Sequence, residues 1–288
     1  MAIELTQLSQ GIRLDGVTDF SLADTLSCGQ CFRFFPNEDG SFSGVAGQHE
    51  ARILQQGDSL VFYGATYQEV QDFWSIYLDL HTDYGAIREL LCQDPTLRRA
   101  AQYAPGIRIL RQDAWEALCS FILSQNNNIK RIQGIIRTLC AQFGEKLPSG
   151  GFCFPSAKRL AECTLEDLAS LRCGFRAKYV LDAARRVSSL DLDLEALRTA
   201  PLDTARPELM RIHGVGPKVA ECALLYGLHR MECFPVDVWI SRAMKALFPK
   251  GLPQFALPYA GIAQQYLFHY VRTSCALEDN RPAAAPSC

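Results

Sequence analysis

The hydrophobic period of this 288-residue chain changes near residue 70. Residues 30–63 contain short β-prone runs separated by polar turns such as NEDG and QQGD, namely QCFRFF, SFSGVAG, ARILQ and SLVFYG. Such runs predict an antiparallel sheet. From Gln71 onward apolar residues recur at helical spacing, as in WEALCSFILSQ and IKRIQGIIRTLCAQF. The sequence therefore predicts an α+β fold in which an N-terminal antiparallel sheet precedes a mostly helical part.

Two boundaries divide the chain: the change of period, near residues 70 to 90, and a charge shift near residue 105. Residues 105–187 hold 13 Lys and Arg against 7 Asp and Glu, although the whole chain has a formal net charge of −2. A basic segment permits local contact with nucleic acid, and a solvated basic face is an equally common cause. We assign 1–90 to the sheet domain, 112–248 to a helical core, and 91–111 with 249–288 to helical segments beside that core.

Composition narrows the class of protein further. Twelve cysteines with scattered spacing do not resemble a small disulfide scaffold and are expected to be reduced thiols, mostly in the core. The start of the chain lacks the pattern of a signal peptide, and no apolar run is long enough to span a membrane. We therefore expect a soluble cytoplasmic protein.

Helices are expected to start at Thr164 and at Asp203 and Thr204, with Pro207 in a first turn.

The most informative stretch runs from residue 207 to 248. In HGVGPK, His213 to Lys218, two glycines permit a tight turn with exposed N–H groups, and Pro217 suits the first position of a following helix. A turn at a helix N-terminus attracts phosphate, although a G-x-G alone is more often a plain turn. Lys218 is expected in the first turn of an apolar helix, where the helix dipole and burial disfavour its charge and suit a nucleophilic amine. A lysine that extends to solvent is the alternative.

Asp237 follows a Pro-Val pair and precedes another apolar-periodic helix. This position predicts an N-cap, and the same carboxylate could also stand beside a reacting group.

The stretch Cys28-Gly29-Gln30-Cys31 is a C-x-x-C, but no second pair of ligands accompanies it, and it leads into a β-prone run rather than a helix. Both facts argue against a zinc site and against a thioredoxin-like dithiol.

At this point the sequence resembles the helix-hairpin-helix DNA glycosylases, and within them the 8-oxoguanine DNA glycosylases. The resemblance extends from about Leu14 to Tyr270 through several motifs. It implies that 112–248 is the glycosylase core and that the hairpin His213, Gly214, Val215 and Gly216 binds DNA phosphate. It also implies that Lys218 is the nucleophile that forms a Schiff base, assisted by Asp237.

The same resemblance assigns further residues. SQNNNIKRI would face the cytosine left behind by the extruded base, through Asn126 and Arg131. In CGFRAKY, Phe175 would be the wedge, where the family commonly has Tyr, and Arg176 would contact the orphan base. The lesion pocket would be formed by the Gly29 carbonyl, Cys222, Gln264 and Phe268. Trp239 stands where the family often has a histidine that contacts phosphate, which puts that contact in doubt.

The resemblance implies a bifunctional glycosylase and AP lyase that excises 8-oxoguanine opposite cytosine from duplex DNA, acting as a monomer without a metal or an organic cofactor. It would work beside the nucleoid in a bacterium or in the nucleus of a eukaryote. Two alternatives stay open: a glycosylase of another lesion specificity, and a non-catalytic helix-hairpin-helix module that only binds DNA. Relatives with an iron–sulfur cluster carry four closely spaced cysteines after the aspartate, whereas only Cys275 and Cys288 follow Asp237 here.

Overall fold

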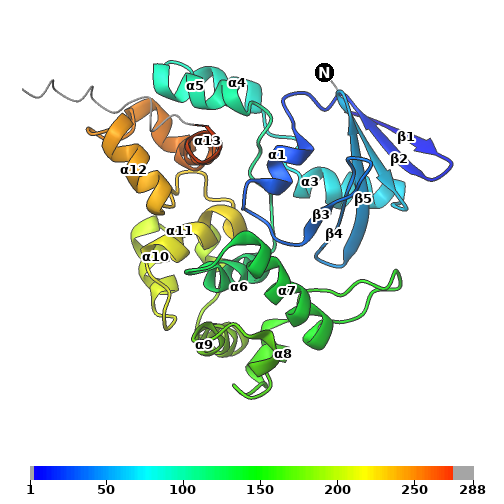
Figure 1. Cartoon of the computed structure of the whole chain (residues 1–288), viewed down its shortest axis with the longest axis vertical. Coiled ribbons are helices and arrows are strands. Elements are labelled where there is room, and N and C mark those ends of the chain that lie inside the picture. The colour runs from blue at the N-terminus through cyan, green and yellow to red at the C-terminus, as the bar shows by residue number, and fades with distance from the viewer. Residues whose placement is uncertain (1–2, 275–288) are drawn as a thin grey trace, which may run out of the picture.

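The N-terminal part of the chain forms one antiparallel sheet in the computed structural model, which describes residues 3–274. Its six strands lie in the order β1-β2-β6-β5-β4-β3 (Figure 1). Apolar side chains alternate along the strands and turn toward one face, as Ile12 and Leu14 do in β2 and Ala51 and Ile53 in β5. The strands are β1 Glu4–Leu8, β2 Gly11–Asp15, β3 Phe34–Pro36, β4 Phe42–Ala46, β5 His49–Gln56 and β6 Ser59–Tyr63.

A helical segment, residues 67–77, covers the apolar face of the sheet. It consists of α2 Tyr67–Glu69, a π-helical turn Val70–Trp74 and α3 Ser75–Tyr77, and it begins with a capping box in which Thr66 and Glu69 bond each other's backbone. Trp74 is fully buried and meets Phe34 edge to face with ring centroids 6.2 Å apart. The sheet therefore has an aromatic core of its own.

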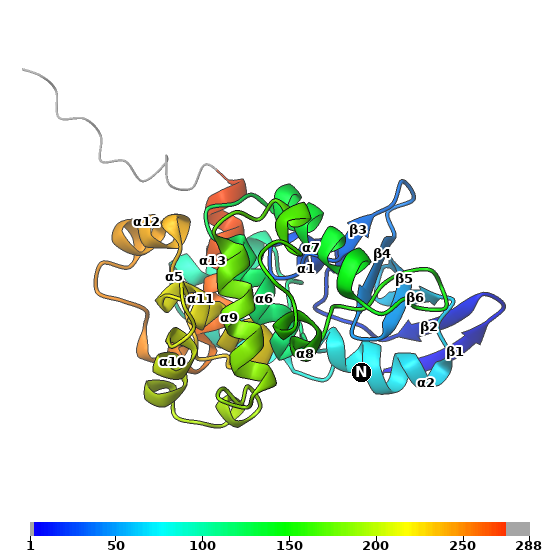
Figure 2. The ribbon, with the colours of Figure 1, turned by 90° about the horizontal axis from the view of Figure 1, so that it is seen from below.

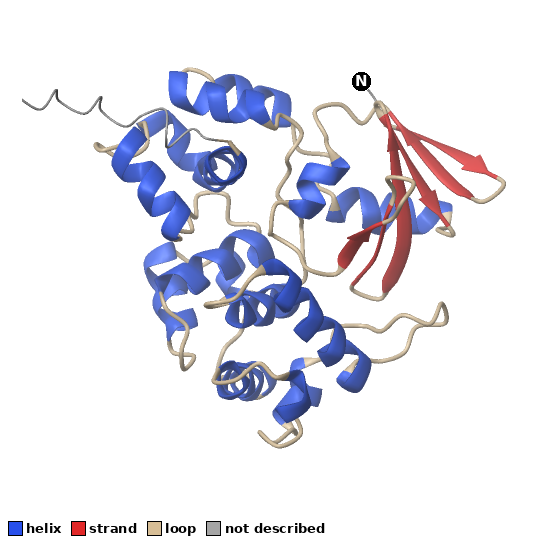
Figure 3. Cartoon of the chain, viewed as in Figure 1, coloured by secondary structure: helices blue, strands red, loops and turns tan. Residues whose placement is uncertain are grey.

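The remaining described residues, up to 274, are mostly helical and lie beside the sheet, as Figures 2 and 3 show. The α+β prediction is thereby confirmed, while the assignment of 1–90, 91–111, 112–248 and 249–288 to separate units stays a prediction. The α-helices are α1 Leu22–Ser27, α4 Tyr84–Leu91, α5 Pro95–Tyr103, α6 Ala114–Ser124, α7 Ile129–Phe143, α8 Ala157–Ala161, α9 Arg176–Ser188, α10 Leu202–Met210, α11 Pro217–Cys222, α12 Val238–Leu247 and α13 Ala260–Thr273. Shorter 3₁₀ turns span Ala169–Leu171, Ala196–Arg198 and Gln254–Tyr259, and a π-helical segment, Ala223–Gly227, continues α11.

The strand prediction was wrong at the start of its range and right at its end, where β6 stops at Tyr63. The strands β1 and β2 come before residue 30, and the run QCFRFF is a strand only from Phe34. The residues before Phe34 bend instead, because Gly29 has a φ of +91° and the Gln30 side chain bonds backbone groups of a neighbouring segment. Phe32 consequently packs in the helical core rather than in the sheet.

Two helix starts were also wrong. Thr164 and Asp167 bond each other's backbone N–H groups as in a capping box, but only a turn and a short 3₁₀ helix follow, and Arg172 ends them with a φ of +50°. The later helix, α10, begins at Leu202 with Pro201 as its N-cap, two to three residues before the expected cap. Pro207 therefore lies inside α10.

The extended segment 106–112 joins the sheet to the helical part. Arg108 is 5% exposed, and its guanidinium donates hydrogen bonds to the carbonyls of Thr18 (2.8 Å), Asp19 (3.2 Å), Asp79 (2.8 Å) and Thr82 (3.0 Å). One side chain thus satisfies four carbonyls from two loops. No helix among residues 3–274 is long and apolar enough to cross a membrane.

Replacing Arg108 by leucine should destabilise the fold by about 3 kcal/mol, because four buried or partly buried carbonyls lose their donors together. Urea unfolding followed by circular dichroism measures the change. Arg99→Leu on the exposed face of α5 is the matched control and should change stability by less than about 0.5 kcal/mol. Equal stability of the two variants would contradict the role given to Arg108.

Candidate active site

Most of the residues singled out in the sequence line two adjoining cavities. The larger has a volume of about 700 Å³, and the smaller, of about 60 Å³, shares five lining residues with it. The predicted site residues that line one or both are Gly29, Asn126, Gly216, Lys218, Cys222, Asp237, Trp239, Gln264 and Phe268. The other six predicted site residues line neither cavity: Arg131, Phe175, Arg176, His213, Gly214 and Val215.

The hairpin turn before α11 has a conformation that requires glycine. Gly214 has a φ of +79°, and a Cβ placed on it would lie 2.3 Å from the ring of Tyr179. The Tyr179 ring also meets the His213 ring edge to face, with centroids 4.9 Å apart. The N–H groups of Gly214 and Gly216 have no hydrogen-bond partner among the described residues. The turn therefore presents free donors beside a helix N-terminus.

Lys218 occupies the second position of α11, after Pro217, and is half-buried. The expected Pro217 at the helix start is confirmed. The Lys218 Nζ lies 3.4 Å from the hydroxyl of Ser124 and 5.2 Å from the centre of the Phe121 ring. Within residues 3–274 no carboxylate lies at ion-pair distance from this amine. Lys218 thus points into the cavity without being held by a salt bridge.

Cys222 lies one turn further along α11 and is 2% exposed. Burial raises the pKa of its thiol to about 11, against the opposite effect of Lys218. The thiol is therefore protonated near neutral pH. In this state it offers a small, polarisable surface to the smaller cavity and is a poor nucleophile.

Asp237 is the N-cap of α12, as the sequence predicts. Its Oδ1 accepts from the Ile240 N–H at 2.8 Å, whereas Oδ2 has no hydrogen-bond partner in the described part of the chain. Capping fixes the carboxylate at the wall that both cavities share with Lys218. Two residues further, Trp239 is 39% exposed, and the Arg242 guanidinium lies 5.8 Å from the centre of its ring. A cation therefore stands close to the position where histidine is missing.

The C-x-x-C loop is anchored through the glutamine between its cysteines. Gln30 donates to the carbonyls of Thr25 (2.9 Å) and Arg108 (2.7 Å), and its side-chain oxygen accepts from the Leu110 N–H at 2.9 Å. The thiols of Cys28 and Cys31 are free and buried, and burial raises the pKa of Cys28 to about 12. No group of three or more His, Cys, Asp or Glu able to hold a metal occurs between residues 3 and 274.

The asparagine loop between α6 and α7 is held by Arg176. This arginine is 6% exposed and donates to the carbonyls of Gln125 (2.6 Å) and Asn126 (2.9 Å). It thereby supports Asn126 in a left-handed conformation with a φ of +49°. Phe175, beside Arg176, is 46% exposed. The exposed Arg131 donates to the Arg172 carbonyl at 3.3 Å.

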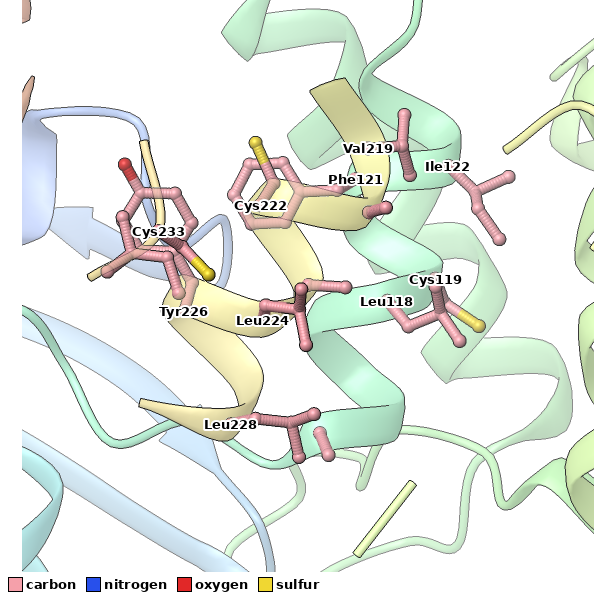
Figure 4. Packing of buried hydrophobic residues seen from close by; sticks show 14 of the residues in the cluster. Leu118, Cys119, Phe121, Ile122, Val219, Cys222, Leu224, Tyr226, Leu228 and Cys233 are labelled. Carbon is pink, nitrogen blue, oxygen red and sulfur yellow. The ribbon is translucent and has the colours of Figure 1, made fainter. Parts of the chain in front are cut away.

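The sequence analysis missed several polar and aromatic residues that line the cavities, five of which make contacts important for the site. Phe121 and Ser124 come from α6, Tyr226 from the continuation of α11, and Gln265 and Arg272 from α13. Phe121 and Tyr226 stack with ring centroids 5.0 Å apart, and Figure 4 shows both among the packed side chains between α6 and α11. The sequence marks these residues only by their position on helices next to the motifs described above.

Two family models match the chain. One describes the N-terminal domain of 8-oxoguanine DNA glycosylase and matches residues 14–118. The other describes the HhH-GPD superfamily of base excision DNA repair proteins and matches residues 119–251. Together they cover the sheet from the end of β2 onward and most of the helical part.

Curated relatives carry related names. The chain is 38% identical over 167 residues to the N-glycosylase/DNA lyase of Saccharomyces cerevisiae, a match that covers 52% of this chain and 44% of the yeast protein. It is 32% identical over 219 residues to a probable N-glycosylase/DNA lyase of Methanothermobacter thermautotrophicus, covering 65% of this chain and 70% of that protein. The chain thus spans less than half the length of the yeast relative.

Solved structures agree with these matches over nearly the whole chain. MBOgg1 in complex with a low-affinity DNA ligand superposes with a TM-score of 0.89 at 41% identity, covering 94% of this chain and 99% of that one. The 8-oxoguanine glycosylase/lyase of Clostridium acetobutylicum, in complex with DNA containing cytosine opposite 8-oxoguanine, gives 0.86 at 35% identity, covering 94% and 98%. The resemblance seen in the sequence is confirmed: this chain belongs to the 8-oxoguanine DNA glycosylases of the HhH-GPD superfamily.

Proposed function

We propose that this protein is a bifunctional N-glycosylase and AP lyase that excises 8-oxoguanine opposite cytosine from duplex DNA. The observation that carries the proposal is the shared wall of the two cavities, where the amine of Lys218 and the carboxylate of Asp237 border a pocket lined by Gly29 and Cys222. A nucleophile and an anion at the mouth of a recess suit attack on the sugar of an extruded nucleotide. Names of the relatives support the same activity.

The amine of Lys218 attacks C1′ of the extruded nucleotide. The new Nζ–C1′ bond forms as the C1′–N9 bond breaks, and the departing base takes the bonding electrons and a proton. Opening of the sugar ring gives an imine between Lys218 and C1′. Removal of a proton from C2′ then expels the 3′ phosphate, which nicks the strand. Asp237 Oδ2, free of partners among the described residues, stabilises the positive charge that develops on the sugar.

The carbonyl of Gly29 recognises the oxidised base. Oxidation at C8 turns guanine N7 from an acceptor into an N–H donor, so a carbonyl can accept from the lesion but opposes the lone pair of normal guanine. Gln264 faces the Watson–Crick edge of the base, and Phe268 and Cys222 pack against its two faces. All four residues line the smaller cavity. Asn126 and Arg131 bond the cytosine left in the duplex.

Phosphate contacts hold the bent duplex over this site. The free N–H groups of Gly214 and Gly216 bind one phosphate, and Arg242 beside Trp239 supplies a cation next to it. Phe175, exposed at the start of α9, enters the gap left by the extruded base. The partner is therefore double-stranded DNA with an oxidised purine, and we expect a monomer to act in the compartment that holds the cell's DNA.

Replacing Lys218 by glutamine should abolish borohydride trapping of the protein on duplexes that contain 8-oxoguanine, because an amide cannot form an imine. The measurement is the yield of covalent protein–DNA complex on a denaturing gel. Lys158→Gln on exposed α8 is the control and should trap like the wild type. Trapping of the Lys218 variant at the wild-type yield would refute the nucleophile, and binding without any strand cleavage by the wild type would favour a DNA-binding module.

Replacing Gly29 by alanine should slow base excision about tenfold or more, because a side chain at a φ of +91° is strained and displaces the recognising carbonyl. The nearest neighbour of the added Cβ is Ile129, 3.6 Å away, so strain rather than collision causes the loss. Single-turnover excision of 8-oxoguanine measures it. The double variant Cys28→Ser/Cys31→Ser should keep the wild-type rate within a few-fold. An inactive but folded double variant would show that the thiols are needed.

A further inference from the structure

Three buried polar side chains stand behind the lesion pocket. Tyr226, Gln264 and Gln265 are 5%, 4% and 1% exposed, and all three line the smaller cavity. The Tyr226 hydroxyl lies 2.6 Å from Gln265 Oε1 and 3.3 Å from Gln264 Oε1, and Gln265 Nε2 lies 3.3 Å from the carbonyl oxygen of Cys28. The groups form one chain of contacts from the backbone beside Gly29 to the residue that faces the base.

The direction of the hydrogen bonds in this chain is set at its far end. A backbone carbonyl can only accept, so Gln265 must turn its NH₂ group to Cys28. Its Oε1 then faces Tyr226, and the tyrosine must give its single proton to that oxygen, over the short distance of 2.6 Å. After this donation the Tyr226 oxygen can act only as an acceptor.

The last link fixes Gln264. Its Oε1 at 3.3 Å would place two acceptors opposite each other, whereas a half-turn of the amide brings its NH₂ group to the same position and makes a hydrogen bond. The other end of the amide has no hydrogen-bond partner among the described residues. After the half-turn that end is the carbonyl oxygen, and it faces the cavity.

We propose that Tyr226 and Gln265 are positioning residues that fix the polarity of Gln264, so that the pocket accepts purines whose Watson–Crick edge donates hydrogen bonds. Guanine-type bases donate from N1 and N2, whereas adenine-type bases accept at N1. The Gly29 carbonyl accepts from N7–H, which every 8-oxopurine carries, so it cannot separate 8-oxoguanine from 8-oxoadenine. The hydrogen-bond chain through Gln265, Tyr226 and Gln264, called the relay below, makes that distinction. This inference rests on the proposed function of the pocket.

A purely structural role for the three side chains makes a different prediction. Each hydrogen-bonded pair would then only satisfy buried polar groups and tie the Cys28 loop to α13. Each substitution would slow excision of 8-oxoguanine and of 8-oxoadenine by the same factor. If the relay operates, the substitutions differ in how they orient the amide of Gln264. Gln265→Met frees the Tyr226 proton to bond Gln264 Oε1, which turns the amide the wrong way, whereas Tyr226→Phe lets the amide turn either way.

Single-turnover excision of 8-oxoguanine opposite cytosine tests the relay in four proteins. We expect a fall of about tenfold or more for Gln265→Met and a smaller fall for Tyr226→Phe, which keeps the ring stacked on Phe121. The double variant should be faster than Gln265→Met alone, because removing the hydroxyl removes the wrongly placed donor. The rate ratio of 8-oxoguanine to 8-oxoadenine should follow the same order.

Tyr266→Phe is the matched control, because this neighbouring hydroxyl is buried without a hydrogen-bond partner in the structure. It should leave both the rate and the ratio unchanged. A double variant as slow as or slower than Gln265→Met, with an unchanged ratio, overturns the relay while leaving the pocket assignment intact. Failure of the wild type to excise 8-oxoguanine would instead refute the proposed function. Thermal unfolding of each variant checks that it is folded.

Discussion

The antiparallel packing of α6 against α11 and its π-helical continuation determines the geometry of the active site. One face of α6 carries the contacts at residues spaced by four and three: Ala117 faces Gly227, Phe121 stacks on Tyr226, and Ser124 accepts a hydrogen bond from Lys218. A Cβ on Gly227 would lie 3.0 Å from Ala117, so the close approach at this end depends on glycine. The same packing directs Lys218 toward the start of the asparagine loop.

A second constraint brings the sheet domain into the site. Gln30 and Arg108 bond the backbone of neighbouring segments, and through them the Gly29 carbonyl is held against a cavity built mainly by helices. The lesion pocket thus draws on residues more than 200 positions apart in the chain. Under the proposed function, the N-terminal loop and α13 would recognise the base, while Lys218 of α11 and Asp237 at the N-cap of α12 would supply the chemistry.

Much of this could be predicted from local sequence. The change of period indicated the two parts of the fold, and the positions of Pro217 and Asp237 at helix starts followed from their local preferences. What local sequence could not reveal depended on tertiary contacts: Phe32 packs in the helical core although its run looks like a strand, and Arg176 bonds loop carbonyls. The hydrogen-bond chain through Tyr226 and Gln265 also lies outside any motif, because its members meet only in the folded protein.

The most direct test of this account is a crystal structure of the Lys218→Gln variant bound to a duplex that contains 8-oxoguanine opposite cytosine. We expect the lesion base outside the helix, with its N7 within about 2.7–3.2 Å of the Gly29 carbonyl oxygen and its C1′ beside residue 218. A base that remains stacked in the duplex, or one that enters the cavity with N7 turned away from Gly29, would contradict the account.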